Sequence, residues 1–302
     1  MKNKFERPMR FGEILDVTFQ ISKGHFSKLF LLLLIFMGPI ILLQALSEII
    51  AGYDLIRDVD NSQWFEQSLN TYEDASLLMA VAESIGIILT TLLMTLFYPV
   101  LFAAIILLVK RVKDGEAYTV SELIKKAFTR FWPLLWSTLL ISVIVSAILI
   151  IPTIIILTIL FSSIATNALA GIITAFLLFL GGFIGFGLLF TRWSFYLPAV
   201  LFDRVAPGLT ASWKLSKGRV WKLFWLYVVF ILITFAFITV VELFSFFLGM
   251  SVLYGVILNI VILFTTLFTV VGYGVMYFDS VTRNTADDLK GMIHTYHEEK
   301  LQ

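Results

Sequence analysis

The chain has 302 residues, of which 59% are hydrophobic and 14% are charged, and its mean hydropathy is +0.94. Soluble domains carry about 25% charged residues, so this composition excludes a water-soluble fold and indicates an integral membrane protein. The formal net charge is +1 and cysteine is absent. These values point to no charged partner and exclude disulfides, thiolate nucleophiles and cysteine metal sites.

The first predicted element is an amphipathic helix. Its apolar stripe, at the i, i+3, i+4, i+7 spacing of one helix face, consists of Phe11, Ile14, Leu15, Thr18, Phe19 and Ser22. We expect this helix to end at Gly24, since glycine is a common helix terminator. Shorter stripes over residues 120–131 and 209–216 precede later apolar runs, and Thr119 or Ser121 is a candidate cap for the second helix. All three helices are expected to lie along a membrane surface.

Six apolar runs are long enough to cross a bilayer, which requires about 20 mostly apolar residues. They cover residues 26–50, 84–109, 133–161, 169–190, 220–248 and 251–278. Runs such as LFLLLLIF lack the alternating pattern of a membrane β-barrel. The sequence therefore predicts an all-α integral membrane protein with six transmembrane helices in one polytopic domain, residues 1–290. A short cytoplasmic tail, residues 291–302, is expected to follow.

Lysine and arginine are strongly segregated among the loops. All but Arg57 of the 22 Lys and Arg residues lie in the N-terminal segment 1–28, in the segments 110–132 and 191–222, or after the last span. Cytoplasmic loops of membrane proteins carry such an excess. We therefore expect a multi-pass cell-membrane protein with both termini in the cytoplasm and the acidic loop 51–76 outside.

A ten-residue segment occurs twice, as ISKGHFSKLF (21–30) and LSKGRVWKLF (215–224), with six identical positions. Each copy lies between an amphipathic helix and a pair of spans. This arrangement predicts three parallel repeats near residues 10–109, 119–190 and 207–278, related by an axis along the membrane normal. The second repeat has RFWP in place of the duplicated turn.

The basic and aromatic residues of these segments favour contact with lipid headgroups. Docking to a cytoplasmic protein is a weaker alternative, and nucleic-acid binding is disfavoured because the aromatic residues continue into a membrane span. The candidate interfacial lipid contacts are Lys23, Lys28, Lys214, Lys217, Arg219, Lys222, Trp213 and Trp221.

Polar residues in the outer halves of the spans form a candidate cavity: Glu48, Glu83, Glu242 and Asn259. A carboxylate within a bilayer is costly and often marks an ion or substrate path. The alternative interpretation places the carboxylates in the hydrated interface or in local pairs. Asn259 then makes an interhelical hydrogen bond.

The fourth span and its exit contain two further candidates. Gly181 and Gly185 form a small-xxx-small face for close helix packing, with a hinge or gate as the alternative. Arg192 and Asp203 flank a predicted bend at Pro198 and form a candidate cytoplasmic ion pair, with a lipid-headgroup or substrate site as the alternative. No catalytic or metal-ligating pattern stands out, so neither a cofactor nor a metal is expected.

Three segments resemble a bacterial membrane-protein family: RPMRFGEILDVTFQISKGHFSKLF (7–30), RWSFYLPAVLFDRVAPGLTASWKLSKGRVWKLF (192–224) and YFDSVTRNTADDL (277–289). The family is similar to the membrane domain of glycerophosphoryl diester phosphodiesterase, a six-helix region without the catalytic carboxylates. The resemblance implies a stand-alone bacterial membrane module and implies no phosphodiesterase activity.

We interpret the chain as a non-catalytic membrane module that binds lipid, a peptide or a membrane or cytoplasmic protein partner. Candidate roles are envelope homeostasis, export and protection from a membrane-active agent. The alternative is a transporter or channel that uses the outer-half carboxylates. A membrane enzyme would require a polar pocket around Arg192 and Asp203.

Overall fold

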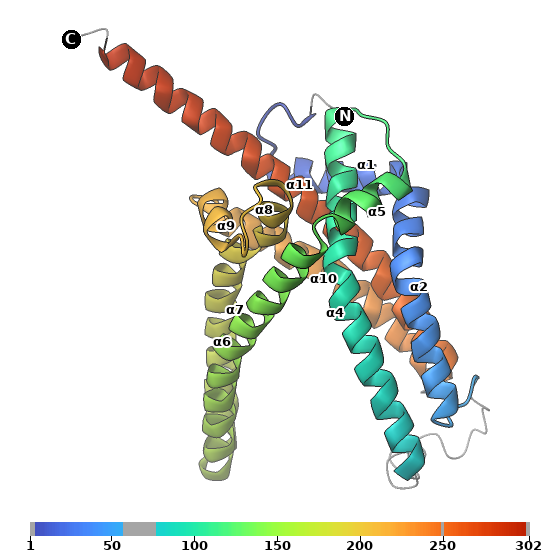
Figure 1. Cartoon of the computed structure of the whole chain (residues 1–302). Coiled ribbons are helices and arrows are strands. Elements are labelled where there is room, and N and C mark those ends of the chain that lie inside the picture. The colour runs from blue at the N-terminus through green and yellow to red at the C-terminus, as the bar shows by residue number, and fades with distance from the viewer. Residues whose placement is uncertain (1–3, 57–76, 249–250, 300–302) are drawn as a thin grey trace. The chain divides into compact units, whose positions relative to one another are not determined.

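The computed structural model describes residues 4–56, 77–248 and 251–299, and all regular secondary structure in these residues is helical. In chain order the helices are α1 (Phe11–Gly24), α2 (Phe26–Ile50), α4 (Leu77–Asp114), α5 (Val120–Phe128), α6 (Phe131–Thr166), α7 (Ala168–Trp193), α8 (Tyr196–Phe202), α9 (Leu209–Ser216), α10 (Val220–Leu248) and α11 (Val252–Glu299) (Figure 1). Among the described residues, α2, α4, α6, α7, α10 and α11 carry segments long and apolar enough to cross a membrane. The predicted all-α, six-span membrane class is confirmed.

In chain order a short helix, α1, α5 or α9, precedes each pair of long helices. Two features differ from the prediction. α11 continues for 48 residues to Glu299, so residues 291–299 extend a membrane-crossing helix. An additional helix, α8, forms around Pro198, because proline is tolerated in the first turn of a helix, where its missing N–H needs no partner.

The chain packs as two compact units. Unit 1 contains Gly12–Phe128 and Val229–Val275, whereas unit 2 contains Asn3–Phe11, Thr129–Val228 and the chain from Met276 onward. The first part of α10 and the last part of α11 therefore belong to unit 2, and the remainder of both helices belongs to unit 1.

The core of unit 1 is the second half of α4. Leu101 and the run 103–109 are almost fully buried on every side, as expected for a helix that is apolar all around. Two glycines of α11 allow close packing in this unit. A Cβ at Gly274 would lie 3.2 Å from Val109, and a Cβ at Gly272 would overlap the ring of Phe230.

The buried face of α1 differs from the predicted stripe. The buried residues are Ile14, Val17, Thr18 and Ile21, whereas the predicted Phe11 and Phe19 are 37% and 57% exposed. Thr18 tolerates burial because its hydroxyl donates to the Ile14 carbonyl at 2.7 Å. Phe19 instead packs on Phe268, with ring centroids 4.4 Å apart. Aliphatic side chains thus take the core positions, and the aromatic residues lie at the edge.

The start of α5 has a reciprocal cap at Thr119, one of the two predicted candidates. The Glu122 N–H donates to Thr119 Oγ1 at 3.3 Å, and the Thr119 N–H donates to Glu122 Oε2 at 3.4 Å. This capping box satisfies two N–H groups that the first helical turn leaves without intrahelical partners. It fixes the point where the chain leaves α4 and begins the second amphipathic helix.

In unit 2, α6 and α7 lie side by side as a hairpin (Figure 1). In the most apolar 18-residue stretch of each of the two spans, none of the residues is buried. Since lipid tails are as apolar as leucine side chains, this surface suits direct contact with the hydrocarbon of a membrane. The Asn167 side chain begins α7 by accepting from the Ala170 N–H at 3.3 Å.

Candidate functional site

Two of the four residues of the predicted polar cavity come together in unit 1. The Gln44 side-chain amide donates to Glu48 Oε1 at 3.0 Å, and Asn259 Nδ2 donates to Gln44 Oε1 at 3.4 Å. Gly255 of α11 leaves room for the carboxylate, because a Cβ there would lie 3.3 Å from Glu48 Oε2. Gln44, which the sequence reasoning missed, therefore links Glu48 of α2 to Asn259 of α11 in a polar cluster.

Of the other two predicted residues, the structure describes the side chain of Glu242 alone. Glu242 is exposed on α10. Glu83 belongs to α4, and its side chain lies outside the described residues. The geometry is a hydrogen-bonded cluster of three side chains, and this arrangement matches the alternative in which Asn259 makes an interhelical hydrogen bond.

Arg192, at the end of α7 in unit 2, contacts an aromatic ring and not the predicted Asp203. Its guanidinium carbon lies 4.4 Å from the centroid of the Trp213 ring, a cation–π arrangement. Ser212 Oγ donates to the Arg192 carbonyl at 2.7 Å and accepts from the Phe195 N–H at 2.9 Å. These bonds hold α9 against the end of α7. Within the described residues Arg192 and Asp203 form no salt bridge, because α8 separates them along the chain and Trp213 covers the guanidinium.

The candidate packing glycines of α7 have no close neighbour in the described residues. A Cβ added at Gly181 or Gly185 would meet nothing within 4 Å. The close approach occurs instead at Gly187, where a Cβ would lie 2.5 Å from the Phe224 ring. Within unit 2, α7 meets α9 and the start of α10 near its C-terminal end, so the glycine that permits contact lies beyond the predicted pair.

The predicted lipid-contacting residues divide into two groups. The exposed group contains Lys23, Lys28, Lys214, Lys217, Trp213 and Trp221. Arg219 and Lys222 instead bind main-chain carbonyls inside unit 2, at Ser280 (3.2 Å) and Met9 (2.7 Å) respectively. The charged groups of these two residues are therefore engaged within unit 2. Met9 lies outside a helix, and its buried carbonyl requires a donor.

Three charged side chains surround Met9 in unit 2, of which the carboxylate is buried and the two cations are partly exposed. We call Lys222, Asp279 and Arg283 the Asp279 cluster. The Asp279 carboxylate, 4% exposed, accepts from Arg283 Nε at 2.9 Å and lies 3.7 Å from Lys222 Nζ. It also accepts from the Met9 N–H at 2.7 Å. The Met9 carbonyl accepts from Lys222 Nζ at 2.7 Å and from the Arg283 guanidinium. Both polar main-chain groups of one residue are thus bound by charged side chains.

The contacts of the Asp279 cluster join all three segments that carry the family resemblance. Met9 lies in RPMRF, Lys222 in WKLF, and Asp279 with Arg283 in YFDSVTR. The sequence reasoning missed this group of residues. The available signal was an Asp and an Arg four positions apart at the end of an apolar span, where a carboxylate without a partner is costly.

A related contact lies in unit 1, at the first copy of the duplicated segment. Lys28 Nζ donates to the Tyr118 carbonyl at 3.4 Å and lies 4.2 Å from the centroid of its ring. His25 Nδ1 lies 2.6 Å from the Tyr118 hydroxyl. Burial, and secondarily the charge of Lys28, lowers the pKa of His25, while burial raises the pKa of Tyr118 to about 12. With both groups neutral at pH 7, the phenol donates and the imidazole accepts.

Lys28 and Lys222 occupy the same position in the duplicated segments. Each donates to a carbonyl two residues before an amphipathic helix begins, Tyr118 before α5 and Met9 before α1. A lysine of one predicted repeat thus binds the start of another. The second repeat has no lysine at this position, and the threefold repeat itself stays a prediction.

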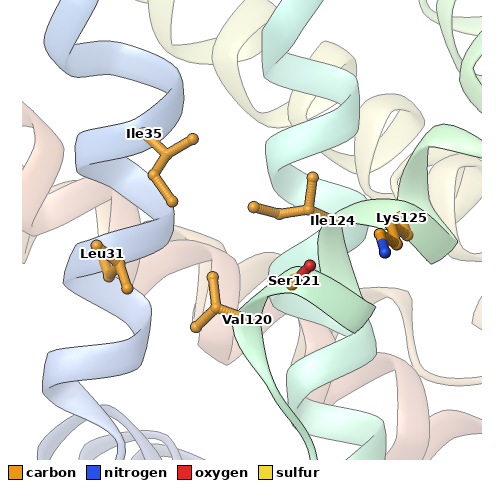
Figure 2. A pocket seen from close by; sticks show the side chains of 6 residues that line it. All are labelled: Leu31, Ile35, Val120, Ser121, Ile124 and Lys125. Atoms are coloured by element: carbon orange, nitrogen blue, oxygen red, sulfur yellow. The ribbon is translucent and has the colours of Figure 1, made fainter.

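Two cavities lie between α2, α4 and α5 in unit 1. The first, of about 490 Å³, is lined by Leu31, Ile35, Val120, Ser121, Ile124 and Lys125. Figure 2 shows Leu31 and Ile35 of α2 facing Val120 and Ile124 of α5 across this space. The second, of about 410 Å³, is lined by Ile35, Phe36, Pro39, Ile40, Leu43, Leu93, Phe97, Ile124 and Phe128. Because Ile35 and Ile124 line both cavities, we treat them as one α2–α5 groove. Its polar lining residues are Ser121 and Lys125.

In the part of the chain that the structure describes, no three His, Asp or Glu side chains gather closely enough to hold a metal ion. Comparisons with models of protein families, with curated proteins and with solved structures return no match. Function is therefore inferred from the groove and the two polar clusters themselves.

Proposed function

We propose that the chain is a non-catalytic membrane protein that binds an anionic phospholipid in the α2–α5 groove. The observation that carries this proposal is the pair of adjoining apolar cavities, about 490 and 410 Å³, with Ser121 and Lys125 at the α5 end. Ligand pockets generally measure about 300–1,000 Å³. An acyl chain suits the apolar lining, and a phosphate headgroup suits the lysine and the hydroxyl.

The headgroup end supplies the selectivity. Within a bilayer the apolar wall distinguishes poorly between lipids, since lipid tails resemble apolar side chains. A basic residue near an anionic leaflet contributes about 1 kcal/mol, which corresponds to a factor of about five in affinity. Lys125 and the neighbouring Lys126 are exposed on α5. We therefore expect a modest preference for anionic over zwitterionic lipid.

The proposed setting is the cell membrane, with both termini in the cytoplasm and α5 at the cytoplasmic headgroup level. The segregation of lysine and arginine supports this orientation. A non-catalytic module of this kind, as the family resemblance implies, suits envelope homeostasis, export or protection from a membrane-active agent.

Native mass spectrometry of the protein released from vesicles with equal phosphatidylglycerol and phosphatidylcholine tests the proposal. Ile124→Trp places a large side chain in both cavities and is expected to lower the amount of retained lipid. The matched control is Ile88→Trp, at a residue of α4 that is 64% exposed and outside the groove lining. Equal retention by the two variants would rule out the groove.

A second measurement separates the headgroup from the acyl chain. Lys125→Glu is expected to abolish the preference for phosphatidylglycerol while total retained lipid changes little. Arg204→Glu, at an exposed arginine between α8 and α9 in unit 2, is the control and should keep the preference. A Lys125→Glu protein with an unchanged preference would contradict the headgroup contact.

Cation or proton transport is the second candidate function, and the polar cluster of Gln44, Glu48 and Asn259 favours it. A carboxylate hydrogen-bonded to amides within a span is a typical element of an ion path. Glu48→Gln should then abolish proton or cation flux in liposomes, whereas Asp16→Asn, at an exposed carboxylate of α1, should not. Flux that is absent from the unmodified protein, or unchanged by Glu48→Gln, would exclude this candidate.

A further inference from the structure

The segment before α1, residues 4–10, is held in unit 2 as a receptor holds a bound peptide. We call it the leading segment. It contains no α-helix or strand, and the side chains of Phe5 and Met9 are only 3% and 2% exposed. The other five residues of the segment are exposed. The segment is therefore anchored by two apolar side chains four positions apart.

Side chains of α10 and α11 bind the main chain of this segment. Thr282 Oγ1 donates to the Phe5 carbonyl at 3.2 Å, while the Asp279 cluster binds both polar main-chain groups of Met9. Asp279, Thr282 and Arg283 share one face of α11 because they are spaced i, i+3 and i+4. Every peptide offers N–H and carbonyl groups, so side-chain specificity must come from the two apolar anchors.

The charges of the Asp279 cluster compensate one another even when the leading segment is absent. Asp279 is paired with Arg283 at 2.9 Å and with Lys222 at 3.7 Å, and neither contact involves Met9. Loss of the Met9 contacts would therefore not leave a buried carboxylate without a counter-charge, which is the costly case. An empty state and an exchange of one peptide for another are both physically accessible.

We infer that Lys222, Asp279, Thr282 and Arg283 form a peptide-binding site that the chain occupies with its own leading segment. The ligand class is a non-helical peptide with apolar side chains four positions apart. A partner protein that presents such a segment competes for the same contacts. This inference concerns unit 2 and is independent of the proposed lipid groove in unit 1.

The test uses the full-length protein in nanodiscs with a nitroxide attached at Pro8→Cys, since the chain has no cysteine and Pro8 is exposed. Met9→Ala in the same chain weakens one anchor and leaves the receptor intact. A synthetic peptide with the sequence of residues 4–11, KFERPMRF, is then added. Because a tethered segment has an effective concentration of about millimolar, displacement is expected at up to a few millimolar peptide, as growth of the mobile spectral component.

The control peptide carries glutamine in place of both anchors and should leave the spectrum unchanged. In the chain with intact anchors, Asp279→Asn should raise the ratio of mobile to docked label about tenfold, because it weakens charge-assisted bonds. Asp16→Asn should not. Should KFERPMRF fail to displace the segment, or the glutamine peptide displace it equally well, the peptide-site assignment is overturned. The titration on Met9→Ala decides the question even if Asp279→Asn does not fold.

Discussion

The two copies of the duplicated segment turn the chain in different ways. In ISKGHFSKLF, Gly24 is the last residue of α1, and α2 begins after His25. In LSKGRVWKLF, α9 ends at Ser216, and Gly218 adopts φ +75° before α10 begins. In both copies a short helix ends and a long apolar helix starts. The glycine extends the first helix in one copy and forms a left-handed turn in the other.

The shared lysine and leucine behave alike in the two copies. Leu29 and Leu223 are 0% and 2% exposed, and Lys28 and Lys222 both donate to a carbonyl before an amphipathic helix. The surroundings differ, because Lys222 also approaches a buried carboxylate and Lys28 lies over a ring. The two segments therefore share a lysine-to-carbonyl hydrogen bond, and the charged or aromatic groups around the lysine set its strength.

The largest expected effect comes from Lys222→Met. It removes a 2.7 Å bond to the Met9 carbonyl and one of the two cations beside Asp279, and losses of this kind cost about 2 kcal/mol. The thermal midpoint in nanodiscs should fall clearly. Lys217→Met, at an exposed lysine, is the control. An equal fall of the thermal midpoint in both variants would show that the contacts of Lys222 with Met9 and Asp279 add no stability.

The two glycines are expected to respond with opposite signs. A Cβ added at either position would meet nothing within 4 Å, so the backbone conformation alone decides whether alanine stabilises or destabilises the protein. Gly218→Ala should cost about 1 kcal/mol because its φ of +75° is left-handed. Gly24→Ala, at a helical residue, should stabilise by about 0.5–1 kcal/mol. Thermal midpoints that shift in the same direction in both variants would contradict the difference in backbone conformation between the two glycines.

Lys28→Met should cost less than Lys222→Met. Lys28 is exposed, its bond to the Tyr118 carbonyl is 3.4 Å long, and its contact with the ring is a cation–π contact. Such exposed contacts contribute about 0.5–1 kcal/mol. The same thermal measurement provides the check. A loss as large as that of Lys222→Met would mean that the Asp279 carboxylate adds nothing to the contact that Lys222 makes with Met9.

The smallest effect is a pH dependence of stability that arises at the first copy of the duplicated segment, from His25. Burial lowers the pKa of His25 below the unfolded value of 6.5, so the unfolded chain binds more protons as the pH falls below that value. Stability is then complete above pH 6.5 and declines as the pH falls through the folded pKa. His25→Gln should flatten this part of the profile of thermal midpoint between pH 7.5 and 5.5. An identical decline in His25→Gln would assign the effect to other groups.

Much of the fold was predictable because its signals are local. The apolar runs predicted the six spans, and the Thr119–Glu122 spacing contained the cap of α5. The stripe of α1 was predicted less well, since residues on adjoining helix faces are similarly apolar. Packing against Phe268 placed Phe19 at the edge of the buried face.

The candidate sites were predicted only in part. The sequence shows that Glu48 and Asn259 are polar residues within apolar spans. Their connection through Gln44 depends on how α2 and α11 pack against each other. Arg192 was expected to bind a nearby carboxylate and instead contacts Trp213. A charged side chain can reach several possible partners in neighbouring segments, and the sequence does not show which of them it contacts.

The sequence by itself determined the solvent, the helical class and the number of spans, because hydrophobicity accumulates over each run of about 20 residues without reference to the rest of the chain. Only the tertiary structure decided which donor meets which acceptor. Met9 and Asp279 are 270 positions apart, and no local pattern in either segment specifies the other. The partner of a buried polar group is set by long-range packing, and the Asp279 cluster and the α2–α5 groove exist because that packing brings distant segments together.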